Sequence, residues 1–165
     1  VKRLEIIAER FSKIGSIPEL KNTSIVEVIK HVVDYMDKRT SSKVNITYHS
    51  SEKEIIARIN PALFEWVIEN LCKNAVDAME GNGKIDINTF YEKEKIVIEV
   101  KDSGKGIKRK NIKNVFTPGF TTKKRGWGLG LSLAKRIIMN YHKGKIFIKE
   151  TEIGKGTTFR IEFGK

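Results

Sequence analysis

Residues 70–78 read NLCKNAVDA, and this stretch forms the second half of a predicted helix over residues 61–79. Asn70, Asn74 and Asp77 recur at i, i+4 and i+7, so they share one face of that helix. Beside them runs an apolar stripe, formed by Phe64, Ile68, Leu71, Ala75 and Ala78. Amide and carboxylate oxygens are ligands that Mg²⁺ takes together with phosphate oxygens and water. The pattern indicates either a magnesium-phosphate site or a polar face that is simply solvated.

The elements on either side of this helix predict an α/β unit. Asn60 followed by Pro61 is a helix start, and Ser24 with Glu27 is a capping box for a helix to about Arg39. Apolar periodicity predicts two more helices, over residues 1–15 and 129–141. Alternation of apolar and polar residues predicts strands over 44–48, 54–59, 84–90, 95–101, 145–151 and 157–163. We place a boundary near Pro18, which separates a helical lead-in (1–21) from a compact domain (22–165).

Residues 102–107, DSGKGI, directly follow the predicted strand 95–101. A carboxylate at the end of a strand can accept a hydrogen bond from an exocyclic amine. Glycines let the backbone approach a ligand or turn sharply. A loop that uses Asp and Gly only for turn geometry is the alternative interpretation.

Residues 125–132, RGWGLGLS, lead into the predicted helix 129–141. Glycines before a helix start present unpaired N–H groups and the positive end of the helix dipole, which suits phosphate. Lys123 and Lys124 add positive charge just before this segment. No strand immediately precedes it and no G-x-x-x-x-G-K-[ST] motif occurs, so the dinucleotide-fold and P-loop readings do not apply. A flexible glycine loop is the alternative.

Length and composition fit one globular domain, with 165 residues of which 39% are hydrophobic. The net charge of +12 suits nucleic acid, an anionic membrane surface or a polyphosphate ligand. Most of the Lys and Arg residues are scattered between acidic ones, which argues against nucleic acid. No apolar run approaches the roughly 20 residues of a membrane span. The single Cys72 excludes an internal disulfide and suits a reducing cytoplasm.

Taken together, five segments in order resemble the N, G1, F, G2 and terminal glycine boxes of histidine-kinase catalytic domains, over roughly residues 44–163. They are 70–78 (NLCKNAVDA), 102–107 (DSGKGI), 116–123 (FTPGFTTK), 126–130 (GWGLG) and 154–157 (GKGT). The resemblance implies a Bergerat-type fold, a two-layer α/β sandwich whose mixed, mostly antiparallel sheet is covered on one face by three helices. It also implies the Mg-ATP-binding catalytic domain of a two-component sensor histidine kinase.

By this resemblance, Asp102 accepts a hydrogen bond from the adenine amine and Asn74 ligates Mg²⁺. Thr157 lines the pocket floor, and Lys73 either reaches a phosphate or is solvated. His142 is expected to be a helix-end residue and not a ligand. The implied ATP-binding set is Asn70, Lys73, Asn74, Asp77, Asp102, Gly104, Gly106, Ile107, Phe116, Phe120, Thr121, Thr122, Lys123, Gly126, Trp127, Gly128, Leu129, Gly130 and Thr157.

Within that set, Phe116 and Phe120 are expected to anchor a lid whose variable part runs over about 118–125. The glycines of 126–130 would let this lid close on the phosphates. The residues implied in catalysis are Asn70, Asn74 and Lys123, with Lys123 as the candidate donor to the γ-phosphate.

The residue at position 70 separates this chain from hydrolytic relatives. Type II topoisomerases, mismatch-repair proteins and a large chaperone carry a glutamate four residues before the Mg-binding asparagine, where it activates water. An amide such as that of Asn70 cannot take a proton from water at neutral pH, which favours transfer to another acceptor. Glu69 is adjacent but about 100° around the helix, so it faces elsewhere.

An acceptor for the phosphoryl group is not evident in the sequence. His31, His49 and His142 are the only histidines, and none lies in the H-E-x-x-[NR]-P context of the family's phosphoacceptor. Residues 1–15 look like the end of the family's dimerisation hairpin. We therefore expect a cytoplasmic, monomeric chain that binds ATP without autophosphorylation, while membrane anchoring of a full-length protein stays open.

The expected partners are the protein's own dimerisation and phosphohistidine domain and a response-regulator receiver domain, with no nucleic acid. Two alternatives remain at this point. One is a protein-serine kinase of the anti-sigma type, which uses a similar pocket. The other is a non-catalytic module that binds nucleic acid through its positive charge.

Overall fold

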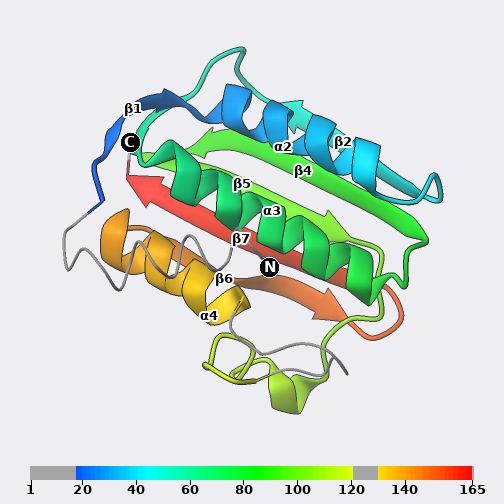
Figure 1. Cartoon of the computed structure of the whole chain (residues 1–165). Helices are drawn as coiled ribbons and strands as arrows, with labels where there is room; N and C mark the ends of the chain where they lie inside the picture. Colours follow the sequence, from blue (N-terminus) through cyan, green and yellow to red (C-terminus); the bar gives the residue numbers. More distant parts are fainter. Residues whose placement is uncertain (1–17, 121–129, 165) are drawn as a thin grey trace.

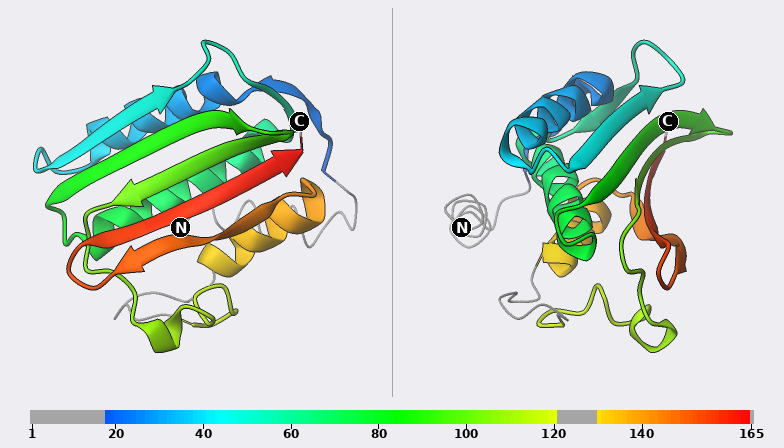
Figure 2. Two further views of the ribbon diagram at one scale, coloured as in Figure 1. Left: turned by 180° about the vertical axis from the view of Figure 1, so that it is seen from behind. Right: turned by 90° about the vertical axis from the view of Figure 1, so that its right-hand side faces the viewer.

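A computed structural model of the chain describes residues 18–120 and 130–164. A five-stranded sheet forms one layer, and the helices form a second layer on one face of it (Figures 1 and 2). The described elements are β1 (Lys21–Ser24), α2 (Ile25–Arg39), β2 (Val44–Ser50), β3 (Ile56–Ile59), α3 (Pro61–Ala78), β4 (Gly83–Glu92), β5 (Lys95–Asp102), the 3₁₀ turn η1 (Arg109–Asn111), α4 (Gly130–Arg136), the π-helical turn η2 (Ile137–Tyr141), β6 (Lys145–Glu152) and β7 (Gly156–Gly164).

The large sheet has the strand order β2-β4-β5-β7-β6. β2 pairs with β4 in parallel, and the other three pairs are antiparallel. The helical layer of Figure 1 consists of α2, α3 and α4 with its continuation η2. The predicted two-layer α/β class, with a mixed and mostly antiparallel sheet under three helices, is therefore confirmed.

Local sequence signals set the starts of the two long helices. The Ser24 hydroxyl accepts the backbone N–H of Glu27 at the start of α2. The Asn60 side chain accepts that of Leu63 at the start of α3, where Pro61 has no N–H to satisfy. Both caps are as predicted.

The core lies between the two layers. Alternate residues of each strand face the helices, as Ile96 and Ile98 do on β5 and Phe159 and Ile161 on β7. The helices contribute the stripes that the sequence predicted, including Phe64, which is fully buried. Each such side chain stabilises the fold by about 1.5–3 kcal/mol relative to leaving it exposed.

One strand, β1, was not predicted. The predicted strand 54–59 is present as β3 but lies outside the five-stranded sheet. Instead β1 and β3 form a separate antiparallel pair, with Lys21 opposite Ile59. This pairing joins residues 32 to 38 positions apart in the sequence, so no local pattern predicts it. The predicted helix 129–141 also divides, because α4 gives way at Ile137 to a π-helical turn.

The outer face of the sheet carries a network of ion pairs centred on Arg160. Its guanidinium donates to Glu92, to Glu99 (3.2 Å) and to Glu162 (2.8 Å). Burial alone would raise the pKa of Glu162, but contacts with Lys95 and Arg160 hold that pKa below its ordinary value. The carboxylates explain how an arginine becomes 92% buried on a face without helices (Figure 2).

His142 ties the end of η2 to the start of α3. Its Nε2 accepts the backbone N–H of Asn60 at 3.0 Å, and its Nδ1 donates to the carbonyl of Ile137 at 2.9 Å. Only the neutral ring with its proton on Nδ1 can make both contacts. Burial lowers the pKa of His142, against the opposing effect of the Ile137 carbonyl. The helix-end position expected from the sequence is confirmed.

We expect the free energy of unfolding to decrease as the pH falls below about 6.5, because the unfolded imidazole then takes up a proton that the buried ring resists. His142→Ala should remove this pH dependence and cost about 1–3 kcal/mol near neutral pH, since the Asn60 N–H loses its acceptor. Urea denaturation at several pH values measures both effects. His49→Ala, at an exposed position, is the control, and an unchanged pH dependence in His142→Ala would contradict this role.

Candidate functional site

Asp102 ends β5 and is the buried carboxylate at the centre of the site. Its side chain is 5% exposed, and its Oδ1 accepts the backbone N–H groups of Gly104 (2.8 Å) and Thr157 (3.3 Å). Among the described residues no hydrogen bond reaches Oδ2. Burial raises the pKa of Asp102, and the two backbone hydrogen bonds oppose that rise. One carboxylate oxygen is thus fixed by the backbone, and the other could accept a hydrogen bond from a ligand.

Two threonines connect the surrounding segments. The hydroxyls of Thr151 and Thr157 lie 2.7 Å apart across the β6–β7 hairpin. Thr151 Oγ1 also accepts the backbone N–H of Ile107 at 2.9 Å, which ties the loop after Asp102 to this hairpin. Thr151 was missed by the sequence analysis. Its position opposite Thr157 in the register of the hairpin was the only signal for it.

The glycines of this region allow chain segments to pack closely. A Cβ on Gly104 would lie 2.8 Å from the carbonyl oxygen of Ala78, and one on Gly106 would lie 2.3 Å from that of Glu152. A Cβ on Gly156 would meet the carbonyl oxygen of Asp102. The sequence interpretation offered a close approach to ligand or a sharp turn. In the structure these glycines admit the backbone of α3 and of the β6–β7 turn.

Helix α3 supplies the second side of the site. The N–H of Lys105 donates to the carbonyl of Ala78 at 3.0 Å, which holds the Asp102 loop against the end of α3. Asn74 and Asn70 lie one and two turns before Ala78, about 6 and 12 Å back along the helix axis. The site is therefore a strip, with a carboxylate at one end and amides along its length.

Gly130, the first residue of α4, covers the far end of this strip. A Cβ on Gly130 would lie 2.7 Å from Oδ1 of Asn70, so the two residues are in contact. In the part of the chain that the structure describes, Nδ2 of Asn70 is buried and has no hydrogen-bond partner. A buried amide with an unused donor is a costly group in a protein interior. It indicates a site that a polar ligand completes.

The charged residues near the amides take different positions. Lys73 is exposed and its Nζ lies 3.3 Å from Oε1 of Glu69, on the preceding turn. Glu69 is 2% exposed, so it points into the protein, as the geometry of the helix predicted for a side chain off the Asn70 face. Its deep burial was not foreseen. Asp77 is exposed.

The segment after η1 is anchored by aromatic packing. The ring of Phe116 meets that of Phe159 edge-on, with centroids 6.1 Å apart, and Nζ of Lys135 lies 5.7 Å from the Phe116 centroid. Phe120 is half-buried, and its N–H donates to the carbonyl of Thr117. The position of Phe116 fits the anchoring role expected for it.

Several residues of the sequence-predicted set lie outside the described residues. They are Thr121, Thr122, Lys123, Gly126, Trp127, Gly128 and Leu129. The described members that the structure brings together form two groups, one around Asp102 and one along α3 up to Gly130.

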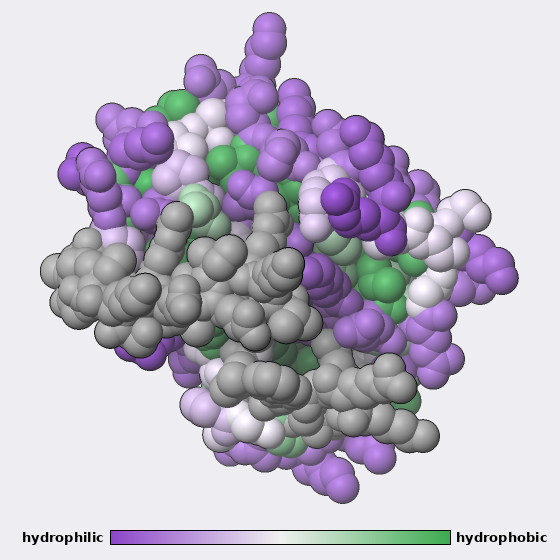
Figure 3. Space-filling model, in the orientation of Figure 1, coloured by the Kyte–Doolittle hydropathy of each residue, from purple (hydrophilic) through white to green (hydrophobic). Residues whose placement is uncertain are grey.

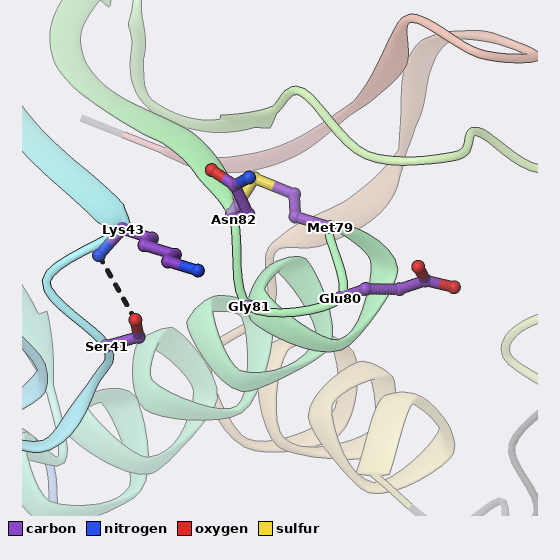
Figure 4. Close-up of a pocket in the computed structure, with 6 residues that line it drawn as sticks. All are labelled: Ser41, Lys43, Met79, Glu80, Gly81 and Asn82. Atoms are coloured by element: carbon purple, nitrogen blue, oxygen red, sulfur yellow. Dashed lines mark hydrogen bonds between the residues drawn. The ribbon is translucent and has the colours of Figure 1, made fainter.

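An open depression of about 600 Å³ lies at the other side of the α3 terminus (Figure 4). Its lining residues are Ser41, Lys43, Met79, Glu80, Gly81 and Asn82. None of the sequence-predicted site residues is among them. The depression is therefore separate from the candidate site, although Met79 accepts a weak hydrogen bond from Ser103 beside Asp102.

Comparisons with known proteins identify the family of the chain. Residues 59–165 match the family described as histidine kinase-, DNA gyrase B-, and HSP90-like ATPase. The chain is 34% identical to the sensor histidine kinase ZraS of Salmonella typhimurium over 145 residues, covering 86% of this chain and 30% of ZraS. It is 28% identical to sporulation kinase C of Bacillus subtilis over 166 residues, covering 98% of this chain and 38% of that kinase. The chain thus spans about a third of the length of these relatives.

Solved structures give the same result for the fold. The nucleotide-free catalytic domain of histidine kinase ThkA superposes with a TM-score of 0.81 at 29% identity, covering 89% of this chain and 96% of that domain. A longer ThkA chain, solved in complex with the response regulator protein TrrA, gives a TM-score of 0.80 at 26% identity, covering 99% of this chain and 48% of that chain.

We expect Gly156→Ala to destabilise the protein by about 3 kcal/mol or more, because the new methyl meets the Asp102 carbonyl and the backbone has a φ of +126°. Gly154→Ala is the matched control in the same turn, with a φ of +81° and nothing within 4 Å of the added Cβ. It should cost only about 1–2 kcal/mol, the strain of the left-handed backbone. Urea denaturation compares the two. Equal losses would contradict the packing role of Gly156.

Proposed function

The chain belongs to the histidine kinase-, DNA gyrase B-, and HSP90-like ATPase family, and we propose that it is the ATP-binding catalytic domain of a sensor histidine kinase. The observation that carries the proposal is the buried Asp102 carboxylate, with Oδ1 fixed by two backbone N–H groups and Oδ2 without a partner among the described residues. Similarity to sensor kinases and to the ThkA catalytic domain supports it.

Asp102 recognises the adenine base in this proposal. Its free oxygen accepts a hydrogen bond from the exocyclic amine, which is a donor and suits a carboxylate. Because the carboxylate is buried, this hydrogen bond forms away from competing water. Thr157 and Ile107 line the pocket around it, and both are held by Thr151.

The amide side chains of α3 take the phosphate end of the nucleotide. Asn74 ligates Mg²⁺ through its amide oxygen, and Asn70 lies one turn further along, beside the phosphates. The donor set fits the ion, since Mg²⁺ prefers oxygen ligands and completes its shell with phosphate oxygens and water. The described residues contain no group of three or more His, Cys, Asp or Glu side chains that could hold a metal. Mg²⁺ bound by Asn74 therefore needs oxygen atoms of the nucleotide as further ligands.

The chemistry proposed is phosphoryl transfer to a histidine. Such a transfer depends mainly on positioning and on neutralising charge at the γ-phosphate, which bound Mg²⁺ and lid donors supply. Asn70 stands where hydrolytic relatives hold a glutamate base, and Glu69 is turned into the protein. Neither residue can activate water at the phosphate. A neutral imidazole acceptor needs little help from a base.

The lid completes the site. Phe116 anchors its start on Phe159, and Gly130 begins the helix at its end. The intervening residues Lys123, Gly126 and Gly128 are assigned to phosphate contacts from their sequence pattern alone, with Lys123 as donor to the γ-phosphate.

Two partners follow from this function. The acceptor histidine lies on the protein's own dimerisation domain, and the phosphoryl group passes on to a response-regulator receiver domain. The ThkA structure, solved with a response regulator, supports the second partner.

We further propose a cytoplasmic location for this segment and a monomeric state for the isolated chain. None of the helices in the described ranges has the length and apolar character that crossing a bilayer requires.

Replacing Asp102 by asparagine should weaken ATP binding about ten- to hundredfold, the worth of a hydrogen bond to a charged acceptor. Stability should not fall, because the asparagine oxygen still accepts from Gly104 and a buried charge is removed. In the natural chain, ATP affinity should decrease as the pH falls through the raised pKa of Asp102, since the protonated carboxyl accepts poorly. Titration calorimetry measures affinity, with the exposed Asp37→Asn as control. Unchanged affinity in Asp102→Asn would contradict the base-recognition role.

Asn74→Ala should abolish Mg²⁺-dependent phosphoryl transfer while leaving metal-free ADP binding unchanged, because the adenine end of the site is intact. The assay supplies γ-labelled ATP and a separately produced phosphoacceptor segment of the full-length protein. Label should appear on a histidine with the natural chain and with the control Asn45→Ala, an exposed asparagine on the outer face of the sheet. Label on serine in place of histidine would refute the proposed function.

A further inference from the structure

The net positive charge of this chain comes from one part of the sequence. Between Asp102 and Glu150 there are 13 Lys and Arg residues and no acidic residue. The rest of the chain holds 19 basic and 20 acidic residues, a net charge of −1. Most of the basic residues, 19 of 32, thus lie among the acidic ones as stated above, while residues 103–149 carry the entire excess of positive charge.

The described basic residues of this segment are all exposed. Six of them form what we call the basic rim, composed of Lys105, Lys108, Arg109, Lys110, Lys113 and Lys135. Elsewhere in the described chain lysines pair with carboxylates, as Lys95 does with Glu162 and Lys73 with Glu69. Among the described residues, no carboxylate pairs with a member of the rim. Its charge is therefore not neutralised by the fold.

The rim borders the nucleotide site without forming it. Lys105 and Lys108 flank Gly106 and Ile107, the loop tied to the Asp102 corner. Lys135 reaches the same region from α4, over the ring of Phe116. Figure 1 shows the η1 loop below α3 and α4, and Figure 3 shows hydrophilic residues along the lower edge of the molecule, with some paler and hydrophobic residues among them.

We propose that the basic rim is an encounter surface that captures nucleoside polyphosphates and steers them into the site. This inference rests on the proposed function and adds a kinetic role for residues that need not touch the bound nucleotide. Clustered charge of one sign at the mouth of a site raises the association rate of an oppositely charged ligand by about 10–1,000-fold. Salt weakens the effect, because the Debye length falls from about 30 Å at 0.01 M to about 10 Å at 0.1 M.

The composition of the rim favours a small anion over a macromolecule. Single-stranded nucleic acid sites combine basic residues with exposed aromatic platforms. The ring of Phe116, which Lys135 overlies, is instead half-buried and packed edge-on against Phe159. Protein interfaces use buried apolar or aromatic anchors. The exposed large hydrophobic residues of the described chain are Ile56, Met139 and Ile153. Ile153 lies beside the rim at Gly106, but a single exposed apolar side chain does not form the apolar patch of an interface.

The test is stopped-flow association of a methylanthraniloyl-labelled ATP at several ionic strengths. Lys108→Glu with Lys110→Glu reverses two charges of the rim, and both side chains are exposed. Lys30→Glu with Lys53→Glu is the matched control, on α2 and on the β2–β3 connection at the top of Figure 1. Each Lys→Glu change lowers the net charge by two, so both double variants carry a net charge of +8 in place of +12.

We expect the rim variant to associate with labelled ATP about tenfold more slowly at low salt, with an unchanged dissociation rate and a flatter dependence on ionic strength. The control variant should behave like the natural chain. Labelled adenosine, which carries no phosphate, should associate at the same rate with all three proteins.

Equal association rates and equal salt dependence for the two variants would overturn the inference while leaving ATP binding, and thus the proposed function, intact. A change confined to the dissociation rate would also overturn it, since it would mean direct contact with the bound nucleotide. Failure of the natural chain to bind the labelled ATP would refute the proposed function itself.

Discussion

Helix α3 contributes both to the core and to the candidate site, and the packing of the other elements depends on that double role. Nine of its 18 residues are buried, which fixes its rotation about its own axis. Successive residues of a helix are about 100° apart, so a fixed apolar stripe also fixes the face that carries Asn70 and Asn74. Gly130 and Gly104 contact this helix at Asn70 and Ala78. The packing that stabilises the domain therefore also sets the length of the site.

The Asp102 corner shows how backbone packing holds a buried carboxylate. The end of β5, the end of α3 and the β6–β7 turn meet there so closely that a Cβ on Gly106 or Gly156 would collide with a carbonyl oxygen. Backbone N–H groups can then reach Oδ1, while burial raises the pKa of the group. A buried carboxylate costs stability, and such costs are typical of functional sites. Here Oδ1 is held by the backbone, while Oδ2 has no hydrogen-bond partner among the described residues.

The charged residues of the protein differ in whether they have partners of opposite charge. On the outer face of the sheet, Arg160 and its three glutamates satisfy one another, and lysines at the edges complete the network. Around the candidate site the basic rim has no described carboxylate partner. The outer face of the sheet has its charges neutralised by ion pairs, whereas the basic rim keeps a net positive charge. Only a surface with a net charge attracts an oppositely charged ligand from a distance. The total charge of +12 does not by itself show this difference between the two surfaces.

Signals local in the sequence were sufficient for the two long helices, for most strands and for the family resemblance, because caps, periodicity and ordered motifs act between residues close in the chain. The same signals identified Asp102 and the amides of α3. They could not reveal the β1–β3 pair, the contact of Thr151 with Ile107, or the burial of Glu69. Each of these features depends on groups that are far apart in the sequence. Such groups come into contact, and stabilise one another, only when the two layers pack together.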